Sequence, residues 1–315
     1  MGKNILQTWA KDPTHAVFGM DLEGKTFAMP ISEGPHWIVA GQTGSGKSVF
    51  MTALLISMIS HTTPDELNIA WVDPKKVEAT AYIGLPYCPI DPVTDMGDAY
   101  GLMAYFTWLM DKRYEKLAAV NVKNVAEFNE WVEKHPEEAA QKGFEKMKYW
   151  VVVIDEYADM VMQEKDVEKN IVRLGQKARA SAIALLIATQ RPSSDIISPI
   201  LKANIPSRIA LKVTDSINSL IILDETGAEK LAGYGDGFVK TQSGEITRVQ
   251  GPRITNEEID RIFSYLRAKY PAPAPVDYKK IVVDAELCEW AEEYADDVPG
   301  EQRHVKKKKM SRLGF

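Results

Sequence analysis

The sequence predicts an α/β fold in which helices cover a mostly parallel sheet. Two observations predict it. Between about residue 36 and residue 215, short apolar or β-branched runs alternate with stretches of helical periodicity. The first of these runs, Trp37–Val39, leads into a glycine-rich segment and then into the apolar helical run Val49–Ile59. Such alternation is typical of a doubly wound sheet, so we expect one large α/β body.

The glycine-rich segment has the spacing of a phosphate loop, Gly41-x-x-x-x-Gly46-Lys47-Ser48. Its glycines let the backbone curl until successive N–H groups point at phosphate oxygens, and the following helix adds the positive end of its dipole. We expect Lys47 to reach the β- and γ-phosphates of ATP and the Ser48 hydroxyl to bind Mg²⁺. An ordinary glycine-rich turn is the alternative, but the strand–loop–helix context favours nucleotide binding. The expected binding segment is Gly41, Gln42, Thr43, Gly44, Ser45, Gly46, Lys47, Ser48 and Val49.

Two further strand signals flank this unit. Ala16–Met29 predicts a short hairpin that leads to the phosphate-loop strand, and Leu67–Val72 predicts a second buried strand. The second strand ends in Asp73-Pro74-Lys75. Because ligands of open parallel sheets bind outside the carboxyl ends of the strands, this segment is well placed to face the nucleotide or a neighbouring subunit. A solvated turn is the alternative, and the residues alone leave both open.

A helical region follows. Thr94–Ala119 carries apolar and aromatic residues at three- and four-residue spacing, which predicts a core-facing stripe rather than a cofactor site. Val125–Trp131 continues as helix, and a polar, charged insert runs from His135 to Lys148. His135 and Glu137 have no partner histidine at ligand spacing, so we expect a solvated surface there rather than a metal site.

The run Tyr149–Ile154 predicts a buried strand, and two carboxylates follow it directly. A P-loop ATPase needs such a pair. We expect Asp155 to hold Mg²⁺ through its water and Glu156 to polarise the water that attacks ATP. A helix N-terminal signal is the alternative explanation of the pair, and the spacing from the phosphate loop favours the catalytic one.

The next strand brings a third polar group to the same region. The helix Lys169–Ser181 precedes the strand Ile183–Ala188, and Gln190 follows that strand. A glutamine in this position can hydrogen-bond the γ-phosphate or the attacking water and respond to the loss of the phosphate. An ordinary loop glutamine is the alternative. The elements expected beyond it are the short helix Pro199–Ala203, the strand Arg208–Val213, the helix Asp215–Asp224, a hairpin of Phe238–Lys240 with Glu245–Val249, and a helix from the capping box at Thr255 to Tyr270.

The composition limits how the chain could bind nucleic acid and indicates the cellular compartment in which it works. The formal charge is −6, so any contact with nucleic acid must come from local patches of Lys and Arg. The two cysteines, Cys88 and Cys288, lie far apart without metal-binding spacing, which fits a reducing compartment. No segment has the length of a membrane span or the pattern of a signal peptide. We therefore expect a soluble, cytoplasmic protein without a membrane segment.

Together these residues resemble the motor domain of the FtsK/SpoIIIE family of double-stranded DNA translocases, over about residues 16 to 252. Many ATPases share the phosphate loop and the Asp-Glu pair, whereas the strings Ala-Thr-Gln-Arg-Pro (188–192) and Lys-Ala-Asn-Ile-Pro-x-Arg (202–208) are specific to this family. The resemblance implies a RecA-like fold that assembles as a homo-hexameric ring around duplex DNA, with ATP and Mg²⁺ bound between subunits. Matching strings also include Val72–Lys75, Val93–Met96, Arg113-Tyr114, Asn124–Asn129, Val153–Asp159, Gln176–Ala180 and Ile222–Leu231.

The chain departs from this pattern at Leu220, where relatives usually carry an arginine, so no role of that arginine can be carried over. An interface site needs a cation from the neighbouring subunit, and our candidates are Arg179 and Arg208; surface ion pairs are the alternative. The membrane anchor, the preceding domain and the C-terminal winged-helix module of long relatives are not evident, which suggests a minimal motor of the kind that a phage or mobile element carries. Candidates for contact with DNA phosphates are Lys202, Lys240 and Arg248.

The resemblance also suggests a division into domains. We expect a RecA-like motor domain over residues 1–270, with the lead-in and hairpin in residues 1–30, and a stiff Pro/Ala linker over 271–276. Residues 277–315 would form an acidic helical segment (Ala285–Asp297) and a basic tail of unknown partner. The tail is either a solvated charge run or a grip on nucleic acid or an acidic partner, and its cations are Arg303, Lys306–Lys309 and Arg312.

Three functions fit these motifs. The first is an ATP-driven translocase that pumps duplex DNA, of which viral genome packaging is a variant. The second is a related ATPase that moves protein substrates, as in secretion systems, although such relatives often carry several motor units in tandem. The third is an adaptor that binds ATP without hydrolysing it. The complete set of Lys47, Ser48, Asp155, Glu156 and Gln190 argues against the third.

Overall fold

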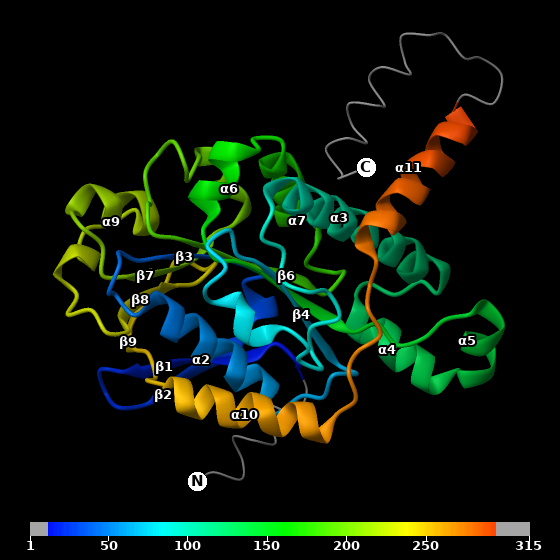
Figure 1. Cartoon of the computed structure of the whole chain (residues 1–315), viewed down its shortest axis with the longest axis horizontal. Helices are drawn as coiled ribbons and strands as arrows, with labels where there is room; N and C mark the ends of the chain where they lie inside the picture. The colour runs from blue at the N-terminus through cyan, green and yellow to red at the C-terminus, as the bar shows by residue number, and fades with distance from the viewer. Residues whose placement is uncertain (1–11, 294–315) are drawn as a thin grey trace.

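The structure is a computed structural model that describes the fold of residues 12–293 and the side chains of residues 12–285. The predicted basic tail and the end of the predicted acidic segment lie outside these residues. One nine-stranded sheet, in the order β2-β1-β9-β8-β7-β3-β6-β5-β4, forms the centre of the molecule (Figure 1). Its strands are β1 (His15–Asp21), β2 (Thr26–Pro30), β3 (His36–Ala40), β4 (Leu67–Val72), β5 (Tyr149–Ile154), β6 (Ile183–Thr189), β7 (Ser207–Leu211), β8 (Asp236–Lys240) and β9 (Ile246–Gln250).

The sheet has a parallel and an antiparallel part. The five strands from β7 to β4 run parallel to one another, which confirms the predicted parallel α/β body. From β7 outward, strands β8, β9, β1 and β2 pair antiparallel, so the sheet as a whole is mixed. Both predicted hairpins are present, as β1–β2 and β8–β9.

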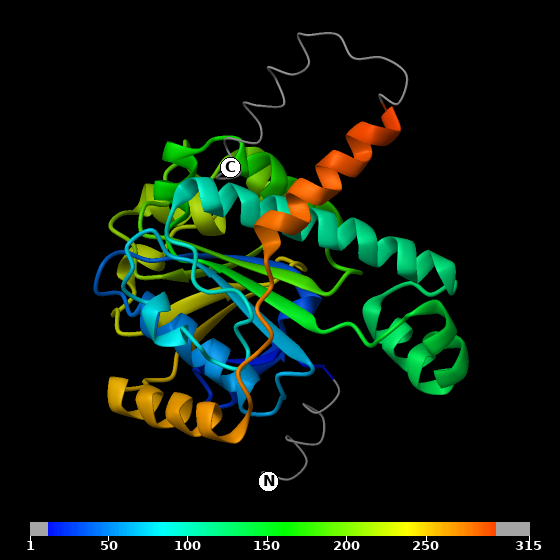
Figure 2. The ribbon, with the colours of Figure 1, turned by 45° about the vertical axis from the view of Figure 1, so that its right-hand side comes forward.

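Helices cover both faces of the sheet (Figures 1 and 2). On one face lie α2 and α10, and on the other lie α3, α6, α7, α8, α9 and α11. The helices are α2 (Lys47–Ile59), α3 (Met96–Ala119), α4 (Val125–Lys134), α5 (Pro136–Lys142), α6 (Tyr157–Gln163), α7 (Val167–Lys177), α8 (Pro199–Asn204), α9 (Ser216–Leu223), α10 (Asn256–Lys269) and α11 (Tyr278–Glu293). Short 3₁₀ turns occupy Ile31–Glu33, Ala79–Tyr82 and Ala228–Lys230.

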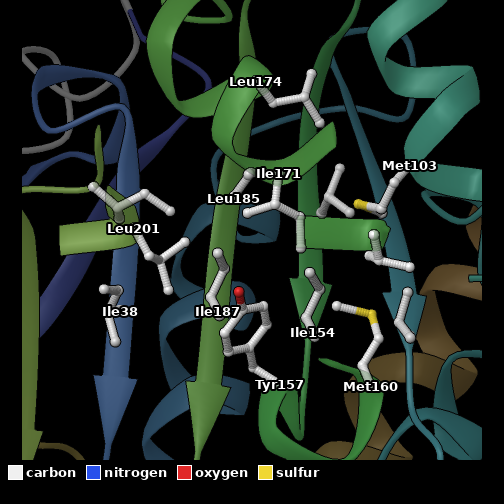
Figure 3. Packing of buried hydrophobic residues seen from close by; sticks show 14 of the residues in the cluster. Ile38, Met103, Ile154, Tyr157, Met160, Ile171, Leu174, Leu185, Ile187 and Leu201 are labelled. Atoms are coloured by element: carbon white, nitrogen blue, oxygen red, sulfur yellow. The ribbon is translucent and has the colours of Figure 1, made fainter. Parts of the chain in front are cut away.

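Alternating side chains of the central strands supply two separate cores. In β3, Ile38 packs into one core, while Trp37 and Val39 pack into the other. Figure 3 shows Ile38, Ile187 and Ile154, from the neighbouring strands β3, β6 and β5, pointing to the same side, where side chains of α3, α6, α7 and α8 cover them. These three strands are therefore held rigidly between two packed layers.

Several boundaries differ from the sequence prediction. The helix after the paired carboxylates, α6, was not predicted, and α5 forms inside the insert expected to be only polar and charged. Helix α7 ends at Lys177 rather than at Ser181, because a turn begins at Ala178. The predicted capping box of α10 is confirmed, with Thr255 accepting from the Glu258 N–H and Glu258 accepting from the Thr255 N–H.

The segment beyond the Pro/Ala stretch packs against the body. Helix α11 begins at Tyr278, ahead of the predicted acidic segment, and lies beside α3 (Figure 2). The Val276 N–H donates to the Pro89 carbonyl at 2.9 Å, and the Tyr278 ring lies 6.4 Å from that of Tyr105. The domain division itself stays a prediction.

A buried histidine makes the stability of this sheet depend on pH. His36 of β3 is fully buried, its Nδ1 accepts a hydrogen bond from the Leu185 N–H at 3.2 Å, and burial lowers its pKa to about 3. In the unfolded chain the imidazole binds a proton near its ordinary pKa of about 6.5. The unfolded state therefore takes up more protons than the folded state as the pH falls below that value.

We predict that the free energy of unfolding falls by about 2 kcal/mol through this residue between pH 7.5 and pH 5. The measurement is urea unfolding at several pH values, for the wild type and for His36→Asn, whose side-chain oxygen can accept the Leu185 N–H but does not titrate. The wild type should lose more stability than the variant over this range. Parallel pH profiles for the two proteins would contradict the assignment.

Candidate nucleotide-binding and catalytic site

The candidate site lies at the carboxyl ends of three adjacent parallel strands. In the sheet β6 lies between β3 and β5, and Ala40 pairs with Thr189 at the ends of β3 and β6. The phosphate loop follows β3, Asp155 and Glu156 follow β5, and Gln190 follows β6 (Figure 1). The register thus brings together the three groups of residues that the sequence predicted to act jointly.

The phosphate loop has the open backbone that a polyphosphate requires. Gly44 and Gly46 take positive φ angles of 80° and 94°. A Cβ at Gly44 would meet no atom within 4 Å, whereas a Cβ at Gly46 would lie 2.6 Å from the Gly235 nitrogen. The Gln42 N–H donates to the Lys212 carbonyl at 2.9 Å and anchors the start of the loop. The loop is therefore a fixed cradle with an open side, which fits the phosphates of ATP.

Lys47 and Asp155 form a buried ion pair. The Lys47 Nζ lies 2.8 Å from Asp155 Oδ1 and 2.9 Å from the Asp155 carbonyl oxygen. Their side chains are only 4% and 6% exposed. The pair holds the ammonium group beside the loop, where it can meet the negative charge of a phosphate.

Glu156 is buried and held by several donors. The Thr189 hydroxyl donates to Glu156 Oε1 at 2.8 Å, and the Gln190 N–H donates to the same oxygen at 3.1 Å. The Lys75 ammonium lies 3.2 Å from Glu156 Oε2. The Gln190 side-chain oxygen accepts from the Thr43 hydroxyl of the phosphate loop at 3.0 Å. The predicted catalytic glutamate, the predicted glutamine and the phosphate loop therefore belong to one hydrogen-bonded network.

The loop after β4 reaches this site through Lys75, so Asp73-Pro74-Lys75 is not simply a solvated turn, and its contact with nucleotide or a neighbouring subunit stays a prediction. Asp73 is fully buried, and its carboxylate accepts the N–H groups of Lys75, Val77 and Ala79 at 2.9 to 3.0 Å. These bonds fix the loop that carries Lys75 to Glu156. Sequence reasoning missed the contact with Glu156, because 81 residues separate the two side chains.

Thr189 is a second contact that sequence reasoning missed. Its hydroxyl donates to Glu156 and also accepts the Arg191 N–H at 3.1 Å. The available signal was its place directly before Gln190, at the end of a buried strand, where a polar side chain is unusual.

The residues expected to hold Mg²⁺ are compatible with that ion. Ser48 lies in the first turn of α2, and Asp155 supplies a carboxylate beside Lys47. Among the described residues, no group of three or more His, Cys, Asp or Glu side chains is arranged to hold a metal. One carboxylate, a hydroxyl and substrate phosphates are the sparse protein ligand set that Mg²⁺ uses in nucleotide sites. Magnesium binding stays a prediction.

The two candidate arginines lie at the amino ends of the strands, away from the phosphate loop of their own chain. Arg179 is exposed in the turn between α7 and β6, beside a cavity of about 560 Å³ that Tyr149 and Lys177 also line. Arg208, at the start of β7, is 7% exposed and bonds the Ile222 carbonyl at 3.0 Å as well as the Asp224 carboxylate. Of the two candidate arginines, Arg179 is exposed and can therefore contact a neighbouring subunit, whereas Arg208 is buried in its own chain.

The structure brings two of the three predicted DNA-binding residues together around one carboxylate. Lys202 and Lys240 lie 2.6 and 3.0 Å from the oxygens of Asp224, which also binds Arg208. Partial burial would raise the pKa of Asp224, but the hydrogen bonds from these three cations outweigh it and hold the pKa well below its usual range. Arg248, the third, forms two hydrogen bonds with Asp236 at 2.8 and 3.0 Å. Leu220 is exposed on α9.

Comparison with known proteins identifies the family. The model of the FtsK/SpoIIIE family matches residues 4–194, which contain the phosphate loop, Asp155, Glu156 and Gln190. The chain belongs to the FtsK/SpoIIIE family. This membership confirms the resemblance seen in the motifs and places the chain among the P-loop ATPases.

Named relatives match nearly the whole chain. It is 39% identical to DNA translocase SftA of Bacillus subtilis over 87% of the chain and 28% of that protein. It is also 39% identical to DNA translocase FtsK 1 of Neisseria meningitidis over 89% of the chain and 36% of that protein. For DNA translocase FtsK of Streptococcus pneumoniae the identity is 38%, over 93% of the chain and 38% of that protein. The chain thus spans about a third of the length of these curated relatives.

Solved structures confirm the fold. The pCW3 conjugation coupling protein TcpA, with ATPγS, superposes with a TM-score of 0.68 at 25% identity, over 82% of this chain and 71% of that one. The secretion ATPase EccC of Thermomonospora curvata gives a TM-score of 0.72 at 22% identity, over 84% of this chain and 32% of that one, a likeness of fold alone. Among residues 12–293, no helix is long and apolar enough to cross a membrane.

The buried ion pair gives a test of the site in the absence of nucleotide. We predict that Lys47→Met lowers the free energy of unfolding by about 3 kcal/mol, because it leaves the Asp155 carboxylate buried without its cation. The double variant Lys47→Met with Asp155→Asn should recover more than half of this loss, since neither charge remains. Chemical denaturation of the two single variants, the double variant and the wild type measures the coupling.

The control is Lys142→Met, which removes one side of the exposed Lys142–Glu138 pair. It should cost less than about 1 kcal/mol. Additive losses in the Lys47 and Asp155 variants would show that the two groups do not interact as described.

Proposed function

We propose that this chain is the motor of an ATP-driven translocase that pumps double-stranded DNA. The observation that carries the proposal is the assembly of Lys47, Asp155, Glu156 and Gln190 at the ends of three adjacent strands. An arrangement of this kind is suited to hydrolysis and not merely to binding, because a buried carboxylate stands beside the residue that senses phosphate. The relatives that match most of this chain are named DNA translocases, which supports duplex DNA as the substrate that is moved.

Each residue has a separate part in hydrolysis. The loop N–H groups and Lys47 bind the phosphates, and Lys47 offsets the charge that develops as the γ-phosphate leaves. Glu156 accepts a proton from the attacking water, and Gln190 orients that water. Ser48 and Asp155 would hold Mg²⁺, which neutralises phosphate charge when it is bound. Since Thr189, Gln190 and Lys75 already hold the Glu156 carboxylate, its position is set before substrate arrives.

We propose that the active form is a homo-hexameric ring with one site at each interface, in the cytoplasm, where ATP and DNA are both available. Of the two candidate arginines, Arg179 suits a role in a neighbour's site, because it is exposed at the opposite end of the strands from its own phosphate loop. Arg208 is nearly buried and is held by the Ile222 carbonyl and by the half-exposed Asp224 carboxylate, which suits a structural role.

Lysine and arginine side chains would contact the phosphates of duplex DNA rather than its bases, so that movement along the DNA does not depend on the base sequence. The Lys202, Arg208 and Lys240 cations outnumber the single carboxylate of Asp224 that binds them, which leaves a local excess of positive charge. We propose that DNA phosphates compete with Asp224 for Lys202 and Lys240, while Arg248 contacts DNA from the adjacent strand β9.

The first test measures steady-state ATP hydrolysis with and without long linear duplex DNA. We expect duplex DNA to stimulate the wild type several-fold, and Glu156→Gln to lower hydrolysis by about a hundredfold or more, because the proton acceptor is lost. Nucleotide binding by Glu156→Gln serves as the control for its folding.

Hydrolysis that responds to neither duplex nor single strands at low salt would contradict the translocase function. Stimulation by a polypeptide instead of DNA would support the secretion-type alternative. A viral genome-packaging ATPase would show the same stimulation by duplex DNA. It differs from other DNA translocases in the DNA that it moves, which is a viral genome.

The second test asks whether Arg179 acts on a neighbouring subunit. Arg179→Ala and Glu156→Gln should each abolish hydrolysis, with a loss of about a thousandfold for the arginine. Mixing the two variants should restore part of it, since some interfaces then combine an intact Glu156 with an intact Arg179. The matched control is Lys177→Ala, which removes an exposed cation two residues away and should retain activity. Mixtures that stay inactive although an affinity tag on one variant co-purifies the other in the same rings would exclude the role of Arg179 in trans.

A further inference from the structure

Tyr234 adopts a backbone conformation that is rare for a bulky residue. It lies between two glycines, and all three residues have positive φ angles, 89° for Gly233, 55° for Tyr234 and 91° for Gly235. The left-handed region is unfavourable for a bulky side chain. The Tyr234 side chain is also 88% exposed, the highest value among the large apolar residues described as exposed. The folded chain therefore places a strained aromatic ring in solvent, where it buries almost no surface.

The backbone of this turn is fastened directly to the phosphate loop. The Gly235 N–H donates to the Ser45 carbonyl at 2.9 Å, and a Cβ at Gly46 would lie 3.1 Å from the carbonyl carbon of Tyr234. The Gln250 side-chain amide donates to the Tyr234 carbonyl at 2.9 Å. These bonds fix the Cα of Tyr234 beside the loop, so its side chain starts from a fixed point next to the phosphate loop.

The order of the strands indicates which end of a nucleotide reaches this turn. The γ-phosphate end is marked by Glu156 after β5 and Gln190 after β6, both on one side of β3. The Tyr234 turn directly precedes β8, on the opposite side of β3, with β7 between them. A nucleotide that lies across the phosphate loop with its γ-phosphate at Gln190 must carry its base toward β7 and β8.

We propose that Tyr234 stacks on the purine base of the nucleotide held by the phosphate loop. This inference rests on the proposed ATP binding and adds a residue for the base to it. An aromatic face binds a base by contact area and dispersion, which supplies the burial that the ring lacks in the free chain. The phenolic hydroxyl is not required for such stacking, so the ring is the essential part.

The test compares two probes on the full chain by titration calorimetry. One is the non-hydrolysable β,γ-imido analogue of ATP, which has a base, and the other is inorganic tripolyphosphate, which does not. The variants are Tyr234→Phe, Tyr234→Ala and Tyr234→Gly. The glycine variant also relieves the positive φ, so its melting temperature should not fall, and it controls for loss of folding.

We expect Tyr234→Ala and Tyr234→Gly to bind the ATP analogue about tenfold more weakly, while Tyr234→Phe binds like the wild type. Tripolyphosphate should bind all four proteins equally. Unchanged affinity of the alanine and glycine variants for the ATP analogue would overturn the stacking role. An equal loss of affinity for both probes would also overturn it, since Tyr234 would then act on the shape of the phosphate loop.

The proposed function fails in a different way. If the wild type binds neither probe, the phosphate loop does not bind nucleotide and both proposals fall. If the wild type binds both probes and only the comparison among Tyr234 variants shows no difference, the stacking role fails and the nucleotide site stands.

Discussion

The parallel register of β3, β6 and β5 is the constraint on which the site depends. Their backbone hydrogen bonds bring three loops to one edge, although the phosphate loop precedes the other two by more than a hundred residues in sequence. Packed cores on both faces of these strands prevent them from sliding. The Lys47–Asp155 pair, the bond from Thr43 to Gln190 and the donors around Glu156 all require that register. The positions of the site residues are thus set by the pairing of the strands and only secondarily by the conformation of each loop.

Several charged side chains are buried at the carboxyl ends of these strands. Lys47, Asp155, Asp73 and Glu156 are all nearly inaccessible, and each is paired or hydrogen-bonded. Such groups are costly to bury and are strongly coupled to one another in a medium of low dielectric constant. We therefore expect an entering polyphosphate to exchange existing contacts for new ones and to alter the contacts of Glu156 and Lys75 as well as those of the loop.

Local patterns predicted most of the strands and helices and selected the candidate site residues that the sheet brings together, because β-branched runs, helical periodicity and the phosphate-loop spacing are short-range signals. The boundary of α11 was missed since contact with α3, not composition, decides where it begins. The salt bridge from Lys75 to Glu156 and the gathering of Lys202, Arg208 and Lys240 on Asp224 join distant segments, and no spacing in the sequence encodes them. In the antiparallel part of the sheet, the hairpins β1–β2 and β8–β9 were predicted, whereas the pairing of β1 with β9 joins remote strands.

The place of β1 in the sheet has a consequence for biosynthesis. Met20 and Asp21 pair with Gln250 and Val249, so β1 cannot complete its pairing until synthesis has reached β9. Closing this long loop is entropically costly and slows folding. During translation the parallel core can form first, while the β1–β2 hairpin has an unpaired edge until the ribosome has added β9. The free edge of the β1–β2 hairpin is therefore open to edge-to-edge association until β9 has been made.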